Sequence, residues 1–272
     1  MAAIYDLATD ESVAYNVNVV GTKHILDFAE SCKKLKRLDY VSTCYVSGNR
    51  TGLIMESDGD IGQEFKNHYE STKCWAEAEI HKRKDTIPTA IYRPGIVMGD
   101  SKTGVTDKYD GPYFLILLLM RLPKWIPMVN IGAGSARPNL VPVDYVVKSM
   151  AYIASKKESL GKTFALSDPN PHTAKDIIKG ILQSLERAKA YGKVPSGLLE
   201  FALSSRLIRK MVKIPKEAII YFNHDVTYDS TNTQDLLKES GITCPDFLET
   251  LPTLVNYVLE NPKKDFLDKR QF

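Results

Sequence analysis

Tyr69 and Lys73 are the residues whose types and spacing most directly suggest chemistry in this sequence. They stand four positions apart in a segment from Phe65 to Asp85 that contains no Gly or Pro and therefore predicts a helix. Residues four apart share one face of a helix, so the ammonium of Lys73 is expected beside the phenol of Tyr69. A nearby positive charge lowers the pKa of a phenol from its ordinary value of about 10, which would prepare Tyr69 for acid–base catalysis.

A short strand before this helix supplies a third polar group. The segment from Leu38 to Ser42 is rich in β-forming residues and predicts a strand, and Gly48 marks the turn that follows. Thr43 comes at the carboxyl end of that strand, where open α/β sheets place their ligand sites. Its hydroxyl is expected to bind the same substrate oxygen that exchanges a proton with Tyr69.

Taken alone, a Tyr and a Lys four positions apart are more often a surface tyrosine beside a solvated lysine. With the strand and the loop before them, they resemble the extended short-chain dehydrogenase/reductase family, and more narrowly its branch of fatty acyl-CoA reductases and thioester reductase domains. Four further segments resemble family motifs in the family's order: residues 1–6 the end of the fourth strand, 16–22 the NVxGT helix, 92–100 the RPGxVxG segment after the sixth strand, and 140–146 the VPVDYV helix start.

The resemblance implies a set of site residues. Thr43, Tyr69 and Lys73 fall on the family's catalytic triad, and Lys73 would also hold the nicotinamide ribose. Asn18 matches a family Asn that lies near the active site and positions its helix; the alternative is a locally bonded or exposed polar residue. The implied cofactor contacts are Ala2, Ala3, Ser42, Tyr69, Lys73, Pro94, Gly95, Ile96 and Val97.

The implied activity is that of an NAD(P)-dependent oxidoreductase, with NADP favoured over NAD. It would transfer a hydride to or from a small-molecule carbonyl, acyl-thioester or alcohol substrate. A sugar-nucleotide epimerase or dehydratase of the same superfamily is an alternative, and it would need polar groups where this chain has the apolar run 113–120. That run could line a pocket for an acyl chain or form a buried helix, and the buried helix is favoured.

One family element does not occur in this sequence. The family opens with a strand, a glycine-rich turn and a helix that hold the cofactor pyrophosphate, whereas this sequence resembles the family only from the fourth strand onward. The Gly132–Gly134 GxG runs into Pro138 and predicts a loop. A third alternative is therefore a truncated, inactive fragment or a subunit that needs another chain for cofactor binding. The chain is accordingly expected to form a homo-oligomer or to bind a partner that supplies the missing N-terminal strands.

The expected fold class is α/β: the C-terminal portion of a doubly wound, Rossmann-type parallel sheet with a mainly helical substrate subdomain. Residues 1–100 and 140–167 are assigned to the NAD(P)-binding domain. Residues 101–139 and 168–272 are assigned to the substrate-binding subdomain.

Two local expectations complete this interpretation. Residues 10–34 predict one long helix, capped by Asp10, with an apolar stripe that includes Val17 and Phe28. The acidic loop before the Tyr69 helix, which contains Glu56, is expected to be solvated because it lacks the ligand spacing of a calcium loop.

The composition excludes several classes of protein. A net charge of +3 is too small to indicate nucleic-acid binding. The four cysteines are widely spaced without a CxxC pair, so we expect no metal site and a reduced, cytoplasmic protein. The apolar run 113–120 is far shorter than a transmembrane segment. A basic cluster over 206–216 suits a peripheral contact with an anionic membrane, although such clusters are more often solvated faces.

Overall fold

The computed structural model describes residues 4, 9–109, 111–121, 130–131, 135–187, 193–194, 221 and 224–262. Several sequence-based predictions therefore fall outside the described residues: the cofactor contacts Ala2 and Ala3, the Gly132–Gly134 loop and the basic cluster 206–216.

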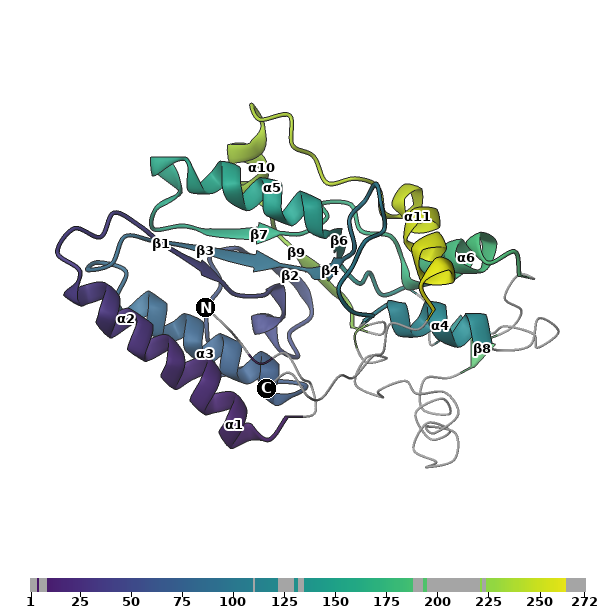
Figure 1. Cartoon of the computed structure of the whole chain (residues 1–272). Coiled ribbons are helices and arrows are strands. Elements are labelled where there is room, and N and C mark those ends of the chain that lie inside the picture. Colours follow the sequence, from purple (N-terminus) through teal and green to yellow (C-terminus); the bar gives the residue numbers. More distant parts are fainter. Residues whose placement is uncertain are drawn as a thin grey trace. The chain divides into compact units, whose positions relative to one another are not determined.

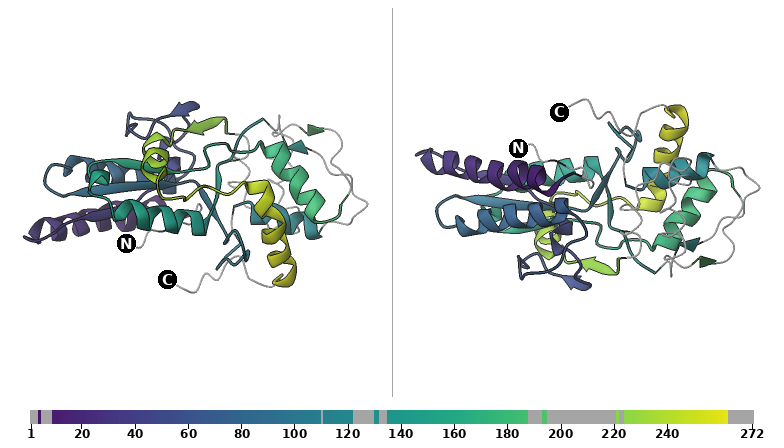
Figure 2. Two further views of the ribbon diagram at one scale, coloured as in Figure 1. Left: turned by 90° about the horizontal axis from the view of Figure 1, so that it is seen from above. Right: turned by 90° about the horizontal axis from the view of Figure 1, so that it is seen from below.

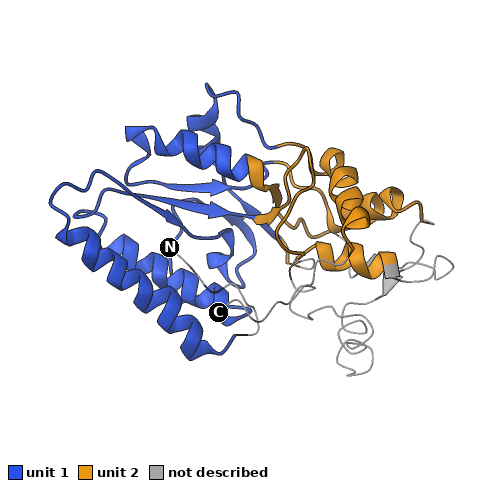
Figure 3. Ribbon diagram, in the orientation of Figure 1, with its two compact units in different colours: residues 1–95, 145–169, 226–244 blue, residues 96–144, 170–225, 245–272 orange. Residues whose placement is uncertain are grey.

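The chain divides into two compact units (Figure 3). The first comprises residues 1–95, 145–169 and 226–244, and the second comprises 96–144, 170–225 and 245–272. The domain boundaries drawn from the sequence stay a prediction. The structure groups 226–244 with the first unit, because a strand and a helix from this segment pack against other parts of that unit.

The first unit is built on a three-stranded parallel sheet. Its strands are β1 (Leu38–Val41), β3 (Thr89–Pro94) and β7 (Thr163–Leu166), in the order β1-β3-β7. Leu38 pairs with Thr89, and Ile91 pairs with Thr163. Every residue of β3 is buried, as expected for the central strand of a sheet that is covered on both faces.

Helices cover both faces of this sheet (Figure 1), which confirms the predicted α/β fold class. One face carries α3 (His68–Lys82) and a continuous helix made of α1 (Glu11–Tyr15), η1 (Asn16–Val20) and α2 (Gly21–Ser31), and the other carries α5 (Val143–Ala154). The η1 segment is a single π-helical turn. Asp10 stands at the N-cap of α1, but its side chain makes no capping hydrogen bond, so that part of the prediction is wrong.

The buried face of the long helix also differs from the prediction. Val17 and Phe28 are exposed, Phe28 to 68%, whereas Ala14, Leu26 and Ala29 are buried. A π-helical turn accommodates an extra residue, so it changes the phase of a periodicity that assumes 3.6 residues per turn. α1, η1 and α2 pack against α3, as Figure 2 shows from above and below.

Helix α3 is fixed at its start by a cap and a tight turn. The side-chain oxygen of Asn67 accepts a hydrogen bond from the N–H of Glu70 at 3.0 Å. Upstream, Gly48 has a φ of +60°, and a Cβ there would lie 2.2 Å from the carbonyl oxygen of Glu64. The turn therefore requires glycine at this position.

Glu56 is a buried structural group rather than part of a solvated loop. It follows β2 (Gly52–Ile54), which pairs in parallel with β9 (Val226–Tyr228), and it lies against the start of α10 (Thr231–Leu237). Its carboxylate accepts hydrogen bonds from the N–H of Ala165 (2.7 Å), the N–H of Asn232 (2.6 Å) and the hydroxyl of Thr233 (2.9 Å). The solvated-loop prediction is wrong for this residue because its donors come from distant parts of the chain.

Replacing Glu56 by Gln is expected to lower the free energy of unfolding by about 2 kcal/mol, since one buried N–H or hydroxyl donor loses its acceptor. Urea denaturation followed by circular dichroism measures this change. Glu158 is exposed, so Glu158→Gln serves as the control and should stay within about 0.5 kcal/mol of the parent. Equal losses in the two variants would contradict the structural role of Glu56.

The second unit has a separate hydrophobic core. Its helices are α4 (Tyr113–Arg121), α6 (Ala174–Ser184) and α11 (Phe247–Glu260), and its strands form the parallel pairs β4 (Ile96–Met98) with β6 (Leu140–Pro142) and β5 (Asn130–Ile131) with β8 (Lys193–Val194). The apolar run 113–120 forms most of α4, and Ile116 and Leu119 are fully buried in the core. The run is therefore a buried helix. No helix in the described part of the chain has the length and hydropathy of a membrane span.

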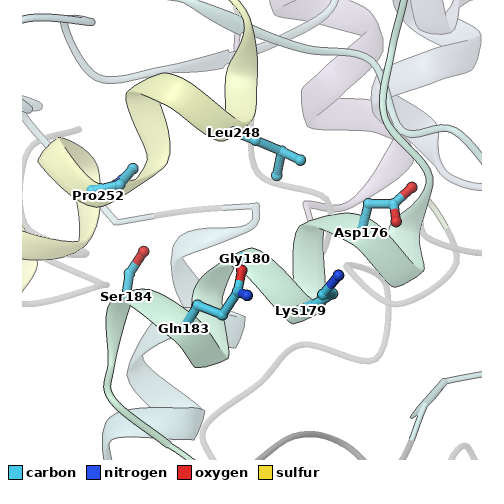
Figure 4. A pocket seen from close by; sticks show the side chains of 7 residues that line it. All are labelled: Asp176, Lys179, Gly180, Gln183, Ser184, Leu248 and Pro252. Carbon is cyan, nitrogen blue, oxygen red and sulfur yellow. The ribbon is translucent and has the colours of Figure 1, made fainter.

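A hollow of about 380 Å³ lies between α6 and α11 (Figure 4). Lys179 and Gln183 line it from α6, and Pro252 lines it from α11. A Cβ at Gly180 would lie 2.8 Å from Leu251, so glycine permits the close approach of the two helices. None of the predicted catalytic residues lines this hollow, and the candidate active site is elsewhere.

Candidate active site

Thr43 occupies the carboxyl end of β1 and caps the short 3-10 helix η2 (Cys44–Ser47). Its hydroxyl oxygen accepts a hydrogen bond from the N–H of Tyr45 at 3.3 Å, and its O–H donates to the carbonyl oxygen of Pro94 at 3.5 Å. Pro94 is the last residue of the adjacent strand β3. Thr43 thus lies where two parallel strands end, the edge at which α/β sheets bind their ligands.

Tyr69 lies in the first turn of α3, and its hydroxyl is close enough to the side chain of Thr43 for that side chain to influence its pKa. Burial raises the pKa of Tyr69 to about 12; the nearby Thr43 side chain opposes this rise, and the charge of Glu70 adds to it. The predicted lowering of this pKa by Lys73 is therefore not what the structure shows. Dehydration of the phenolate outweighs the other effects, so Tyr69 is protonated at neutral pH.

Lys73 lies one turn further along α3, with its ammonium at the end of β1. Its Nζ donates to the carbonyl oxygen of Val41 at 2.7 Å and to the hydroxyl of Tyr40 at 3.2 Å, and it lies 4.6 Å from the centroid of the Tyr40 ring. Burial lowers the pKa of Lys73 to about 8, although the negative charge of Glu77 acts in the opposite direction. Lys73 therefore carries a charge near neutral pH that it loses readily at a slightly higher pH.

Glu77, one helical turn after Lys73 in α3, forms a buried ion pair with Arg93. The sequence analysis did not predict this pair. Arg93 Nε donates to both carboxylate oxygens of Glu77 at 3.2 Å, and Arg93 Nη2 donates to Oε1. Burial alone would raise the pKa of Glu77, but the Arg93 guanidinium lowers it to about 2. The sequence did contain a signal for Glu77: it follows Tyr69 and Lys73 at the same four-residue spacing, which places all three on one face of the helix.

Asn18 lies in the π-helical turn η1 and is 3% exposed. Its Oδ1 accepts a hydrogen bond from the N–H of Ile4 at 3.0 Å, and its Nδ2 donates to the carbonyl oxygen of Ile4 at 3.3 Å and to the hydroxyl of Thr72 at 3.0 Å. The side chain thus links the N-terminal segment to α3 beside Lys73. This arrangement suits a positioning role, which stays a prediction.

The other predicted contacts are distributed over both units. Ser42 is buried, and its N–H donates to the carbonyl oxygen of Tyr92 at 2.6 Å. Gly95 follows Pro94 in the first unit, and its N–H donates to Leu166 at 3.2 Å. Two further predicted contacts, Ile96 and Val97, lie in β4 of the second unit.

Residues 1–150 match the NAD-binding family described as Male sterility protein. The chain belongs to this family. The match confirms the family resemblance drawn from the Tyr69–Lys73 motif and the segments around it.

The chain is similar to parts of much longer proteins. A linear gramicidin synthase of Brevibacillus parabrevis is 30% identical over 248 residues, which are 85% of this chain and 5% of that protein. An alcohol-forming fatty acyl-CoA reductase of Simmondsia chinensis is 41% identical over 63 residues, which are 23% of this chain and 13% of that protein. The chain spans a small fraction of the length of these relatives.

Solved structures confirm the fold of this family member. The terminal R domain of the myxalamid PKS-NRPS pathway superposes with a TM-score of 0.78 at 23% identity, covering 98% of this chain and 68% of that one. A UDP-glucuronic acid 4-epimerase from Bacillus cereus, in complex with NAD, gives a TM-score of 0.67 at 19% identity, covering 97% of this chain and 73% of that one. At these identities the likeness establishes the Rossmann-type fold.

The titration of Lys73 predicts a rise in stability with pH. Its pKa is about 8 in the folded chain and about 10.4 in an unfolded one, so the unfolded state binds more protons between these values. Stability rises with pH wherever the unfolded state binds more protons. We expect the free energy of unfolding to gain about 2 kcal/mol between pH 8 and pH 10 from this group.

Guanidinium denaturation at pH 7, 8, 9 and 10 measures this gain. Lys73→Met should lack it, whereas Lys84→Met, a change at an exposed lysine, should retain it. The pH series ends near pH 10 because the raised pKa of Tyr69 makes the folded state less stable as the pH rises further. An identical pH profile in both variants would show that Lys73 titrates normally.

Proposed function

We propose that this chain carries the catalytic part of an NAD(P)-dependent oxidoreductase that reduces a carbonyl or acyl-thioester group. The observation that supports this most directly is the proximity of the Tyr69 and Thr43 side chains at the end of β1, with Lys73 one helical turn away. These side chains place a proton donor and a hydroxyl within reach of one substrate oxygen. That is the arrangement needed to protonate an oxygen as its carbon is reduced.

The proposed roles follow from the protonation states. Tyr69, with a pKa of about 12, holds its proton at neutral pH and can give it to the substrate oxygen as negative charge develops there. Thr43 lies beside Tyr69, and its hydroxyl would hold the same oxygen. The charge on Lys73 stabilises the phenolate that Tyr69 becomes once substrate and cofactor have displaced water. A bound nicotinamide cofactor would supply the hydride.

The described residues fit the nicotinamide end of such a cofactor. Lys73 donates to Val41 and Tyr40, which leaves one N–H of its ammonium for a ribose hydroxyl. Pro94 and Gly95 follow the strand beside Thr43 and would line the nicotinamide. The sequence contains no glycine-rich turn for the pyrophosphate, so we assign only the nicotinamide side of the site to this chain. We favour NADP over NAD as the cofactor.

The acyl-thioester class is proposed from the relatives rather than from a pocket. The relatives include a fatty acyl-CoA reductase, a protein named aldehyde reductase lnbA and several nonribosomal peptide synthetases. The apolar run 113–120 gives no support, because it forms the buried helix α4. A carbonyl or acyl-thioester substrate is the class consistent with these names and with the Tyr69–Thr43 pair.

Titration of the purified chain with NADPH and NADH, by fluorescence and calorimetry, tests the cofactor proposal. We expect saturable micromolar binding that is tighter for NADPH. Lys73→Ala should weaken it by about 10-fold or more, since it removes a charge-assisted hydrogen bond. Tyr69→Phe keeps the ring, should leave binding nearly unchanged, and should lower reduction of aldehydes and acyl thioesters by about 100-fold or more.

Lys84→Ala is the matched control, because it removes an exposed lysine and should bind as the parent does. Absence of binding at millimolar cofactor would overturn the assignment of a cofactor site to this chain. Equal binding by Lys73→Ala and the parent would overturn the role of Lys73 alone.

A further inference from the structure

In the described part of the chain, Lys73 and Glu77 form no ion pair, although they lie one helical turn apart in α3. Each residue is 3% exposed, and residues four positions apart share one helical face, where a lysine and a glutamate commonly pair. The ammonium of Lys73 instead donates to the Val41 carbonyl and the Tyr40 hydroxyl. Two opposite charges are therefore buried on one face of α3 without a direct hydrogen bond.

Arg93 occupies the carboxylate that Lys73 would otherwise bind. Its Nε donates to both oxygens of Glu77 at 3.2 Å, and its Nη2 donates to Oε1. The guanidinium is itself held in place, because it also donates to the carbonyl oxygens of Glu56 at 3.4 Å and Asp58 at 2.6 Å. A planar guanidinium binds both oxygens of a carboxylate at once, which a lysine ammonium does not match. The competition between the two cations therefore favours Arg93.

The other titratable groups close to Lys73 or Glu77 do not replace Arg93. The Nε2 of His81 in α3 lies 3.4 Å from Oε1 of Glu77, and the side chain of His81 is 42% exposed. Four further groups stay neutral at neutral pH because burial raises their pKa values: Tyr40, Cys44, Tyr69 and Cys74. Arg93 thus supplies the buried positive charge that balances Glu77.

This pairing has a consequence for the third N–H of the Lys73 ammonium. Two of the three N–H groups are directed to Val41 and Tyr40. If Arg93 did not hold Glu77, that carboxylate would take the third, because opposite charges attract strongly where water is excluded. The ammonium would then have no N–H left for a ribose hydroxyl.

We propose that Arg93 is a positioning residue for Lys73: by holding both oxygens of Glu77, it keeps this carboxylate away from the ammonium and leaves one N–H of Lys73 available for the cofactor. The proposal rests on the proposed function for what that N–H binds. The separation of Glu77 from Lys73 is a property of the chain without cofactor, and it can be measured by itself.

Titration of Lys73 without cofactor measures this separation, by NMR of protein labelled with 13C at the lysine ε-carbon. The Lys73 signal, identified by its absence from Lys73→Arg, should titrate near pH 8 in the parent. In Arg93→Met, Glu77 is free to bind the ammonium, and we expect the midpoint to rise by about one pH unit or more. In Arg93→Met/Glu77→Leu no carboxylate remains, so the midpoint should return to the parent value or fall below it.

A parallel titration with NADPH measures the consequence for the cofactor. Arg93→Met should weaken binding by about 10-fold or more although Lys73 is more fully charged, because its third N–H is then bound to Glu77. Arg93→Met/Glu77→Leu should regain most of the parent affinity. A merely structural role of Arg93 predicts no such recovery, since the double variant also lacks the hydrogen bonds from Arg93 to Glu56 and Asp58.

Arg83→Met is the matched control. It removes an arginine from a surface ion pair with Asp27, and it should leave the Lys73 midpoint and the NADPH affinity unchanged. Circular dichroism establishes that each variant is folded, because a buried carboxylate without its partner is strongly destabilising. If Arg93→Met does not fold, Arg93→Lys takes its place: its ammonium cannot hold both carboxylate oxygens in the same way, and it should cause the same changes by smaller amounts.

An unchanged Lys73 midpoint in Arg93→Met, or in Arg93→Lys where only that variant folds, would overturn the proposal. Equal losses of NADPH affinity in the single and double variants would overturn it as well, since Arg93 would then act through packing. A raised midpoint that the double variant reverses, in a chain that binds no NADPH, would support the positioning of Lys73 by Arg93 and contradict the proposed cofactor site.

Discussion

The ion pair between Glu77 and Arg93 is the interaction on which the arrangement of the first unit depends. Arg93 lies in the central strand β3, and its guanidinium also donates to the carbonyl oxygens of Glu56 at 3.4 Å and Asp58 at 2.6 Å. It thus joins α3, the sheet and the segment after β2 at one buried point. A buried charge without its partner is strongly unfavourable, so these groups must come together. Because α3 is a continuous helix, fixing Glu77 also fixes the positions of Tyr69 and Lys73 relative to the sheet.

Burial sets the chemistry of the site as much as its charges do. It raises the pKa of Tyr69 to about 12 and lowers that of Lys73 to about 8, so both groups are shifted toward their neutral forms. The acid therefore keeps its proton at neutral pH, and the lysine lies close to its titration point. Neutral hydroxyl and carbonyl acceptors hold the ammonium, while Glu77 is neutralised by Arg93.

The sequence was most informative where the determining contacts are local. A helix through 11–31 and a helix that carries Tyr69 and Lys73 follow from composition and spacing, and the order of the motifs indicated the family. The prediction failed where the determining contacts are distant. The packed face of the long helix depends on a π-helical turn at Asn18, and the burial of Glu56 depends on donors more than a hundred residues away. Neither feature leaves a periodic signal in the chain.

By itself, the sequence determined which residues share a helical face and which stand at a strand end. Tyr69 and Lys73 were therefore found by spacing, and Thr43 by its place after a strand. The tertiary structure decided the direction of the Tyr69 pKa shift, the pairing of Glu77 and the hydrogen bonds from Lys73 to Val41 and Tyr40. The physical reason is that a pKa or a buried hydrogen bond depends on exclusion of water and on partners from other elements. Spacing along one chain segment specifies neither.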